Sequence, residues 1–262
     1  MNKKSQPYVS IVTPNLNGGK YLEKTILSII NQTNKDFEFI LIDGISTDNS
    51  KNIIEQYIEN IDIFISEKDE SMYHAIHKGI MKASGDVIIW INSDDLLDNN
   101  AVENVIKVFK NNSSINWICG INGYIKNGYQ FSGIPYVYPK LILQKGFANH
   151  AYWGFVQQES VSFRKKLYFQ VGGFDYSFKN SCDYNLWVKF SKVTKLVTLF
   201  IKIGYFRSWP GQDSKINREL TFKSIGFKKV PWFSLRYFRL IISMILLPFI
   251  YLKTKILINR NM

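Results

Sequence analysis

Strand-like and helix-like segments alternate through residues 8–110, and this alternation constrains the fold more than any other feature of the sequence. Apolar runs predict four strands, and a segment with apolar residues at helical spacing follows each of them. The predicted strands are residues 8–15, 37–44, 61–67 and 86–93, and the predicted helices are residues 20–32, 46–60, 71–85 and 98–110. Short connections between alternating strands and helices require a parallel sheet with helices on both faces. We therefore predict an α/β fold with a single Rossmann-like, mixed but mainly parallel sheet.

Individual residues predict where some of these helices begin and end. Ser46 or Thr47 is expected to cap the second helix, and Asp98 the fourth, because short polar side chains accept hydrogen bonds from free amides at helix starts. Gly85 is expected to end the third helix, since helices commonly end with a glycine.

The alternation stops after about residue 111. Residues 118–133 predict paired short strands with turns at Asn122-Gly123 and at Asn127-Gly128. Residues 147–178 are rich in aromatic side chains and predict an irregular stretch, in which His150 stacks among its neighbours. The segment "CDYNLWVKFSK" predicts a further helix.

Polar and acidic residues follow the four predicted strands. The carboxyl ends of parallel strands lie along one edge of a sheet, where open α/β folds bind ligands. That edge receives Pro14-Asn15, Asp43, residues 67–69, and the pair Asp94-Asp95. Repulsion among these carboxylates is severe unless a cation or hydrogen-bond donors lie between them. The sequence therefore predicts a ligand crevice at this edge.

The adjacent carboxylates Asp94 and Asp95 are a candidate metal site. Carboxylate oxygens suit Mg²⁺ or Mn²⁺, whose coordination is completed by water and substrate phosphates. Neighbouring side chains of an extended chain point to opposite sides, so we expect one aspartate to bind the metal and the other a different part of the ligand. The alternative is that the pair caps the next helix, but the converging Asp43 and Asp69 favour a ligand site.

Four blocks of the sequence, in this order, resemble those of inverting glycosyltransferases of family 2, which have the GT-A fold. The blocks are "VSIVTPNLNGGKYLEKTILSIINQT", "FILIDGISTDNS", "SEKDESMYHAIHKGIMKASGDVIIWINSDD" and "VGGFDYSFKNSCDYNLWVKFS". The resemblance covers roughly residues 7–214 and is to the type that assembles bacterial surface polysaccharides and lipopolysaccharides. It implies a nucleotide-sugar donor, with UDP favoured over GDP and dTDP, a Mn²⁺ or Mg²⁺ ion, and inversion at the anomeric carbon. It also implies a nucleotide-sugar-binding half (1–110), an acceptor-binding half with the catalytic base (111–215) and a tail (216–262).

The resemblance assigns roles by position. Asp95 corresponds to the metal ligand, and Asp94 to a nucleotide or sugar contact. Asp183 corresponds to the base that takes the proton from the acceptor hydroxyl; a carboxylate that favours a helix N-terminus is the alternative. The other candidate contacts to the nucleotide sugar are Thr13, Pro14, Asn15, Asp43, Asp69, His77, Arg207 and Gln212, and the candidate acceptor-side residues are Gln158 and Glu159.

Some of these positions keep a second interpretation. His74 and His77 replace the Asp and Asn that this type more often has; we expect His74 to be exposed and His77 to face the crevice. Arg207 and Gln212 lie in a segment that resembles the one closing over the diphosphate, and Arg matches phosphate geometry. A surface loop is the alternative for both, and a structural hydrogen bond is the alternative for Glu159.

The net charge of +12 makes nucleic acid, an anionic membrane surface and phosphorylated substrates candidate partners. The C-terminal tail favours the membrane surface. From Lys223 onward eight basic residues and no acidic residue occur, and they flank the apolar block "LIISMILLPFIYL". This block of 13 residues is shorter than the roughly 20 that span a bilayer. We therefore expect an interfacial helix or hairpin, peripheral to the cytoplasmic face of the bacterial inner membrane, near a lipid-linked saccharide acceptor. Packing on the catalytic domain or on a second subunit of a homo-oligomer is the alternative.

Two other functions fit parts of the sequence. A nucleotidyltransferase also binds nucleotide and metal at strand ends, but it would have a longer Gly-rich, basic loop than "TPNLNGGKYLEK". A non-catalytic nucleic-acid-binding protein would gather its basic residues on one soluble face, whereas here they flank an apolar block and the crevice is acidic. We therefore expect no nucleic-acid partner. A dinucleotide-binding oxidoreductase is excluded because no G-x-G-x-x-G follows the first strand. Two cysteines, Cys119 and Cys182, suit a reducing cytoplasm.

Overall fold

The computed structural model describes residues 6–149, 152–209, 212 and 235–259; His150, Lys223, Lys228 and Lys229 lie outside this range. The strands are β1 (Val9–Asn15), β2 (Phe37–Asp43), β3 (Ile63–Ser66), β4 (Val87–Trp90), β5 (Leu96–Leu97), β6 (Trp117–Lys126), β7 (Tyr129–Ser132), β8 (Val161–Arg164) and β9 (Val197–Arg207). The α-helices are α1 (Leu22–Ile30), α2 (Ser50–Gln56), α3 (Met72–Lys82), α4 (Ala101–Asn111), α5 (Lys140–Gln144), α6 (Lys165–Gln170), α7 (Cys182–Val193) and α10 (Arg236–Asn259). Short 3-10 helices span Ile58–Asn60, Gln158–Ser160 and Tyr176–Ser181.

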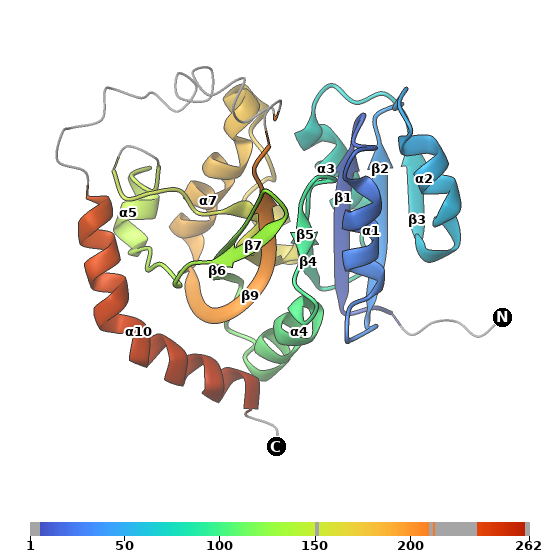
Figure 1. The fold of residues 1–262 in the computed structure, drawn as a ribbon. Helices are drawn as coiled ribbons and strands as arrows, with labels where there is room; N and C mark the ends of the chain where they lie inside the picture. Colours follow the sequence, from blue (N-terminus) through green and yellow to red (C-terminus); the bar gives the residue numbers. More distant parts are fainter. Residues whose placement is uncertain (1–5, 150–151, 210–211, 213–234, 260–262) are drawn as a thin grey trace.

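All these strands belong to one mixed sheet, in the order β3-β2-β1-β4-β8-β6-β9-β5, with β7 paired to β6 (Figure 1). The first four strands are parallel, as their alternation with helices predicted. β8 then runs antiparallel between β4 and β6, and β9 is parallel to β6. Because β4 pairs with β8, both halves of the chain build the same sheet. The proposed division at residues 110 and 215 stays a prediction.

Helices cover both faces of the sheet, which is why β1 is buried along its whole length. On one face Ile11 packs with Ile26 of α1 and with Val105 of α4. On the other face Val12 packs with Ile76 of α3, in a cluster that reaches Trp187 of α7. The apolar residues of α1 and α4 recur every three or four positions, so each helix buries one stripe and leaves its polar side in water.

Three predicted helix boundaries are wrong. α2 begins after Asn49, because the Ser46 hydroxyl and amide are bonded to Asp43 instead of capping a helix. α4 begins after Asn100, and Asp98 accepts hydrogen bonds from the Asn100 amide and from the Tyr205 hydroxyl of β9 (3.0 Å). α3 ends at Lys82, with Ala83 as its C-cap, before it reaches Gly85, which lies against Ser10 of β1.

The second half of the chain is more regular than predicted. Asn122-Gly123 is not a turn; β6 runs through both residues, and Gly123 pairs with Ser132 of β7 and Tyr205 of β9. The turn at Asn127-Gly128 is confirmed, with positive φ angles of 52° and 82° that suit a tight hairpin. Residues 147–178 are not simply irregular, since β8 and α6 lie within them.

The C-terminal tail ends in one helix, α10, that continues through Pro248 for 24 residues. It is long and apolar enough to cross a membrane by length and composition, with a mean hydropathy of 1.9 over its most apolar window, of which 22% is buried. The helix reaches this length only by including Arg239, Lys253 and Lys255, which lie outside the 13-residue apolar block. Figure 1 shows α10 passing along one side of the body from α5 to α4.

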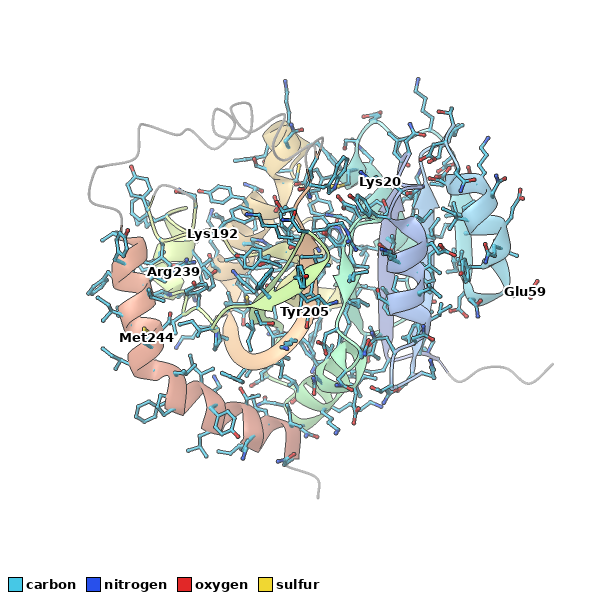
Figure 2. All side chains as sticks on the ribbon, viewed as in Figure 1. Lys20, Glu59, Lys192, Tyr205, Arg239 and Met244 are labelled. Carbon is cyan, nitrogen blue, oxygen red and sulfur yellow. The ribbon has the colours of Figure 1, made fainter. Side chains whose placement is uncertain are left out.

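The inner face of α10 is fixed to the body by polar contacts. The Ser243 hydroxyl accepts a hydrogen bond from the Val137 amide (3.0 Å), and the Thr254 hydroxyl accepts one from the Phe200 amide (2.8 Å). Figure 2 shows Arg239 in the first turns of this helix, where its guanidinium lies 3.7 Å from the centre of the Tyr136 ring. The outer face is apolar and exposed: Ile241, Ile245, Phe249, Leu252 and Ile256. The helix therefore packs on the catalytic domain, the alternative left open by the sequence, and presents a second apolar face outward.

Candidate functional site

The carboxyl ends of β1 and β2 form a buried polar network around Asp43. One carboxylate oxygen of Asp43 accepts hydrogen bonds from Asn15 (2.8 Å) and the Ser46 hydroxyl (2.6 Å), and the other accepts from the Ser46 amide and, at 3.3 Å, from the Ser66 hydroxyl. Asn15 Oδ1 and Thr13 Oγ1 are buried without a hydrogen-bond partner in the described residues. At this edge Asp43 thus has its hydrogen bonds within the protein, while Asn15 keeps an acceptor for a ligand.

The loop after β1 lies against the turn that carries the paired aspartates. Pro14 is buried within β1, and a Cβ atom at Gly18 would lie 2.3 Å from Asn15 Oδ1 and 2.6 Å from the Ser93 hydroxyl. The Thr25 hydroxyl of α1 donates to the Ser93 and Asp95 carbonyl oxygens at 2.9 and 2.7 Å. Close packing and these bonds fix the turn beside the ends of β1 and β2, as the sequence predicted.

Asp94 and Asp95 lie in a turn between β4 and β5, beyond the strand end where an extended pair was expected. The Asp94 carboxylate accepts hydrogen bonds from Trp209 Nε1 (2.8 Å) and Gln212 Nε2 (3.4 Å). Its backbone carbonyl accepts one from Arg207 Nε at 2.6 Å. Burial raises the pKa of the Asp94 carboxyl, although these donors oppose that effect. The end of β9 and the residues after it thus bring Arg207 and Gln212 to Asp94.

Two aromatic rings and a lysine complete this side of the site. The Arg207 guanidinium lies 4.6 Å from the centre of the Tyr21 ring, and the Tyr21 and Trp209 rings are 5.6 Å apart. Lys20 Nζ lies 5.2 Å from the Tyr21 ring and 5.6 Å from that of Trp209. Arg207 Nη2 is buried without a hydrogen-bond partner in the described residues. The sequence analysis did not assign Lys20, Tyr21 or Trp209 to the site, because only the folded chain brings residues 20–21 to residue 209.

Asp95 is completely buried beside a second buried acid, Glu159. Its Oδ1 accepts a hydrogen bond from the Arg207 amide at 2.7 Å, its Oδ2 accepts none from an N–H or hydroxyl group of the described residues, and its carboxyl group is hydrogen-bonded to that of Glu159. Burial, followed by the charges of Glu159 and Asp94, raises the pKa of Asp95 far above its ordinary value. Burial likewise raises the pKa of Glu159 to about 7. Two adjacent buried carboxyl groups share either a proton or a cation.

This arrangement fits a divalent ion that relies on its substrate for ligands. In residues 6–149, 152–209, 212 and 235–259, no three His, Cys, Asp or Glu side chains are grouped so as to hold a metal ion. A complete protein cage is therefore not present in that part of the chain. Asp95 Oδ2 accepts no hydrogen bond from an N–H or hydroxyl group of the described residues and lies among other carboxyl groups. It is the kind of single carboxylate contact that Mg²⁺ and Mn²⁺ use when phosphates and water complete their coordination.

The predicted base, Asp183, lies in the first turn of α7. The hydroxyl of Tyr73, from α3, donates a hydrogen bond to Asp183 Oδ1 at 3.0 Å, and the Tyr73 ring packs edge-on against Trp90. Burial raises the pKa of Asp183 to about 6, although the Tyr73 bond opposes this. The charge of Asp183 also contributes to the raised pKa of Glu159. Tyr73 belongs to a block that the sequence analysis quoted, but it was not singled out.

The remaining predicted residues have partners within the protein. Asp69 pairs with Lys78 at 2.8 Å, which leaves Asp69 Oδ2 buried without a hydrogen-bond partner in the described residues. His77 Nδ1 lies 2.8 Å from the hydroxyl of buried Tyr168, and burial lowers the His77 pKa. Gln158 Nε2 donates to the Trp90 carbonyl at the end of β4. The predicted ligand contacts of these three residues stay predictions.

His74 lies outside the site. Its ring stacks on that of Tyr176 with centres 3.8 Å apart and nearly parallel planes, and its Nε2 lies 3.5 Å from Glu70. His74 is therefore half-buried, and the expectation that it is exposed is wrong, because its ring packs on Tyr176.

Comparisons with known proteins identify the family. The model of glycosyl transferase family 2 matches residues 10–167, which is more than half of the chain. The chain belongs to glycosyl transferase family 2. The matched region of this family 2 chain contains every predicted nucleotide-site residue except Arg207 and Gln212, but it ends before Asp183.

The family 2 chain spans less than two thirds of the length of the curated relatives that it matches. Chondroitin synthase of Escherichia coli is 28% identical over 236 residues, which are 87% of this chain and 32% of that protein. The uncharacterized glycosyltransferase RT0329 of Rickettsia typhi is 27% identical over 196 residues, 72% of this chain and 60% of its own length. The putative teichuronic acid biosynthesis glycosyltransferase TuaG of Bacillus subtilis is 32% identical over 93 residues, 34% of this chain and 37% of TuaG.

Solved structures confirm the GT-A fold of the family 2 chain. TarS 1-349 of S. aureus, in complex with UDP-GlcNAc, matches with a TM-score of 0.64 at 15% identity, over 82% of this chain and 64% of that one. The mannosyltransferase PcManGT of Pyrobaculum calidifontis, in complex with GDP-Man and Mn²⁺, matches with a TM-score of 0.62 at 17% identity, over 97% and 72%.

Proposed function

We propose that this chain is an inverting, metal-dependent glycosyltransferase that moves a sugar from a nucleotide-diphosphate sugar, most simply a UDP-sugar, to a hydroxyl of a lipid-linked saccharide in cell-surface polysaccharide assembly. One observation carries the proposal: buried Asp95, whose Oδ2 accepts no hydrogen bond from an N–H or hydroxyl group of the described residues, lies beside the carboxyl groups of Asp94 and Glu159 at the carboxyl edge of a GT-A sheet. Such a crevice repels an anionic substrate unless a cation accompanies it. TarS 1-349 in complex with UDP-GlcNAc, and PcManGT in complex with GDP-Man and Mn²⁺, support this choice of donor and metal.

The donor would bind between the ends of β1, β2 and β9. Asn15 offers its free Oδ1 to a base or ribose donor, and Lys20 and Arg207 place positive charge where a diphosphate would lie. Tyr21 and Trp209 hold the Arg207 guanidinium in place, which reduces the entropy lost when it binds a phosphate. Asp95 would hold a bound divalent ion, which supplies Lewis-acid stabilisation to the leaving diphosphate.

Asp183 would act as the general base of a single displacement. Its carboxylate takes the proton of the acceptor hydroxyl while the hydroxyl oxygen attacks the anomeric carbon from the face opposite the diphosphate, which inverts the configuration. A base whose pKa is about 6 is ionised at neutral pH and yet more basic than an ordinary aspartate. Tyr73 holds the carboxylate in orientation through its hydrogen bond to Oδ1.

The acceptor would reach the crevice from a membrane surface. The outer face of α10 is apolar and exposed, while the inner face is bonded to the catalytic domain. A helix fixed along its side to a soluble domain fits attachment in the plane of the interface. We place the chain at the cytoplasmic face of the bacterial inner membrane, where nucleotide sugars and lipid-linked saccharides meet.

Substitution of each acid tests the proposal. With Mn²⁺ and a panel of nucleotide sugars, the wild-type chain should show a thermal shift with one donor and release its nucleoside diphosphate. Asp95→Asn should abolish metal-dependent donor binding, whereas Asp183→Asn should keep donor binding and lower transfer by about 10²-fold or more. Full turnover by Asp183→Asn would show that the base is another residue. Release of pyrophosphate instead of nucleoside diphosphate would identify a nucleotidyltransferase and contradict the proposal.

A further inference from the structure

A surface pocket of about 310 Å³ lies beside the C-terminal half of α10, far along the chain from the crevice residues. Three separate segments line it: the end of α4 with Asn112 and Ser114, the connection from α7 to β9 with Thr194 and Lys195, and α10 with Lys253. Figure 1 shows the last turns of α10 beside α4, which is where these segments meet. None of these residues belongs to the proposed donor or acceptor site.

The side chains of this pocket offer donors and positive charge. Lys195 and Lys253 are exposed, and neither forms an ion pair in the part of the chain that the structure describes. No acidic residue lines the pocket. The Ser114 hydroxyl already donates to Asn112 Oδ1 (2.7 Å), so the side-chain amino group of Asn112 remains to donate to a ligand. Two lysines without a counter-ion, next to amide and hydroxyl groups, favour a phosphate.

Apolar surface lies directly beside this basic pocket. Leu252, which precedes Lys253, is 58% exposed, and Ile256, one turn further on, is 55% exposed. Phe200 of β9 and Tyr251 of α10 pack edge-on with ring centres 5.6 Å apart, and both are also exposed, so the apolar surface extends from the helix onto the sheet. A ligand that fills both regions must carry an anionic group and hydrocarbon chains. A free phosphate would leave this apolar surface exposed to water, and the charged backbone of a nucleic acid would not cover it favourably.

We propose that this pocket binds the phosphate of an acidic phospholipid, with its acyl chains against the outer face of α10. The phosphate lies between the ammonium groups of Lys195 and Lys253, and Leu252 and Ile256 face the hydrocarbon. The site rests on the proposed membrane attachment and makes it selective for an anionic bilayer. It does not depend on which sugar is transferred, nor on Asp183.

Vesicle flotation of the full chain tests this site. Wild-type protein is mixed with phosphatidylcholine vesicles or with vesicles that also contain phosphatidylglycerol, and it should float with the second kind. The double variant Lys195→Gln, Lys253→Gln should lose at least about tenfold in apparent affinity for these vesicles, since each lysine near an anionic surface contributes to binding. The matched variant Lys51→Gln, Lys82→Gln changes the net charge equally at exposed positions on α2 and α3 and should bind as the wild type does. If both double variants lost the same vesicle affinity, the binding would be non-specific electrostatic attraction and the proposed phospholipid site would be wrong.

A soluble lipid separates the pocket from membrane attachment as a whole. Dihexanoylphosphatidylglycerol should raise the Tm of the wild-type chain, and it should not do so for Lys195→Gln, Lys253→Gln. Dihexanoylphosphatidylcholine and inorganic phosphate serve as the two controls. An equal shift with inorganic phosphate would show a phosphate site that ignores the lipid, and the proposal would be wrong. If wild-type protein floated with neither vesicle yet bound the soluble lipid, the membrane attachment would fail while the pocket stood. Donor hydrolysis, measured in parallel, reports on the transferase and should be unchanged.

Discussion

Asp183 shows how one residue receives its chemistry from its surroundings. An exposed aspartate is a weak base, but burial at the start of α7 raises the pKa of this carboxyl to about 6. The Tyr73 hydroxyl stabilises the ionised form through a 3.0 Å hydrogen bond. The charge of Asp183 in turn raises the pKa values of Tyr73, Cys182 and Glu159. A carboxylate in such a site is ionised at neutral pH but retains useful basicity.

Transfer by the wild-type chain should therefore fall as the pH drops through about 6, because a protonated Asp183 accepts no proton. Tyr73→Phe removes a hydrogen bond that lowers the Asp183 pKa, so the acidic limb of the kcat/KM profile should move to higher pH. A pH–rate series for both proteins measures the shift. A merely structural role for Tyr73 would lower the rate at every pH and leave the limb in place.

The same shift has a consequence for stability. Since the folded state raises the Asp183 pKa, it binds the proton more tightly than the unfolded state, and this group's contribution to stability is lost as the pH rises from about 4 through about 6. Asp183→Asn removes the buried charge, so its Tm at pH 8 should equal or exceed that of the wild type. Differential scanning calorimetry at pH 5 and pH 8 checks this. A Tm at pH 8 clearly below the wild-type value would contradict the expectation.

At the scale of elements, the turn between α3 and β4 depends on a close backbone approach. A Cβ atom at Gly85 would lie 2.7 Å from the Ser10 hydroxyl and 2.8 Å from the Ser10 amide nitrogen of β1. The buried carboxylate of Glu38 accepts hydrogen bonds from Ser10 (2.5 Å) and from the Ser84 amide (2.6 Å), so β1, β2 and this turn are bonded together. Little room remains for a shift.

Gly85→Ala should therefore destabilise the fold by about 1–3 kcal/mol, because an added methyl group is forced against backbone. Gly133→Ala is the matched control, since the added Cβ atom would lie 3.7 Å from the Asn122 carbonyl oxygen, an ordinary van der Waals contact. Urea unfolding of the two variants measures the free energies. Equal stability of both would mean that the turn relaxes.

Elements near one another in sequence were predictable, and long-range contacts were not. Hydrophobic periodicity located β1 to β4 and α1 to α4, because each buries its own apolar stripe. It could not show that Ser46 bonds to Asp43 instead of capping α2, since both roles suit a serine. Nor could it place Tyr21 against Trp209, a contact that exists only once β9 lies beside the loop after β1. The carboxylates of the candidate site were predictable because strand order in a parallel sheet brings them to one edge.

At the scale of the whole molecule, α10 has apolar residues on both of its sides. Ile250 is 8% exposed and faces the body, whereas Ile245 is 65% exposed and faces outward. The helix continues through Lys253 and Lys255, so it is longer than the uninterrupted apolar block of the sequence. One side of α10 therefore contributes to folding, and the other is the side that we propose for membrane attachment.

The substitution Ile250→Ser should lower the free energy of unfolding by about 2–4 kcal/mol, because it removes a buried side chain. The same change at Ile245 should leave stability within about 0.5 kcal/mol and weaken vesicle binding instead. Thermal unfolding and flotation of the two variants measure both quantities. If both variants bound vesicles as the wild type does, α10 would not be the attachment surface.

Three hydrogen bonds hold α10 against the body and oppose any outward movement of the helix. They involve the Ser243 hydroxyl, the Thr254 hydroxyl and the Leu257 carbonyl oxygen, which accepts from Asn111 at 2.7 Å. If its outer face rests in lipid, the reaction centre is held at a constant height above the bilayer. A lipid-linked glycan shorter than that height would not bring its terminal sugar to Asp183, and a much longer one would have to bend back. The enzyme would then measure the reach of its acceptor, with no need to recognise every sugar along it.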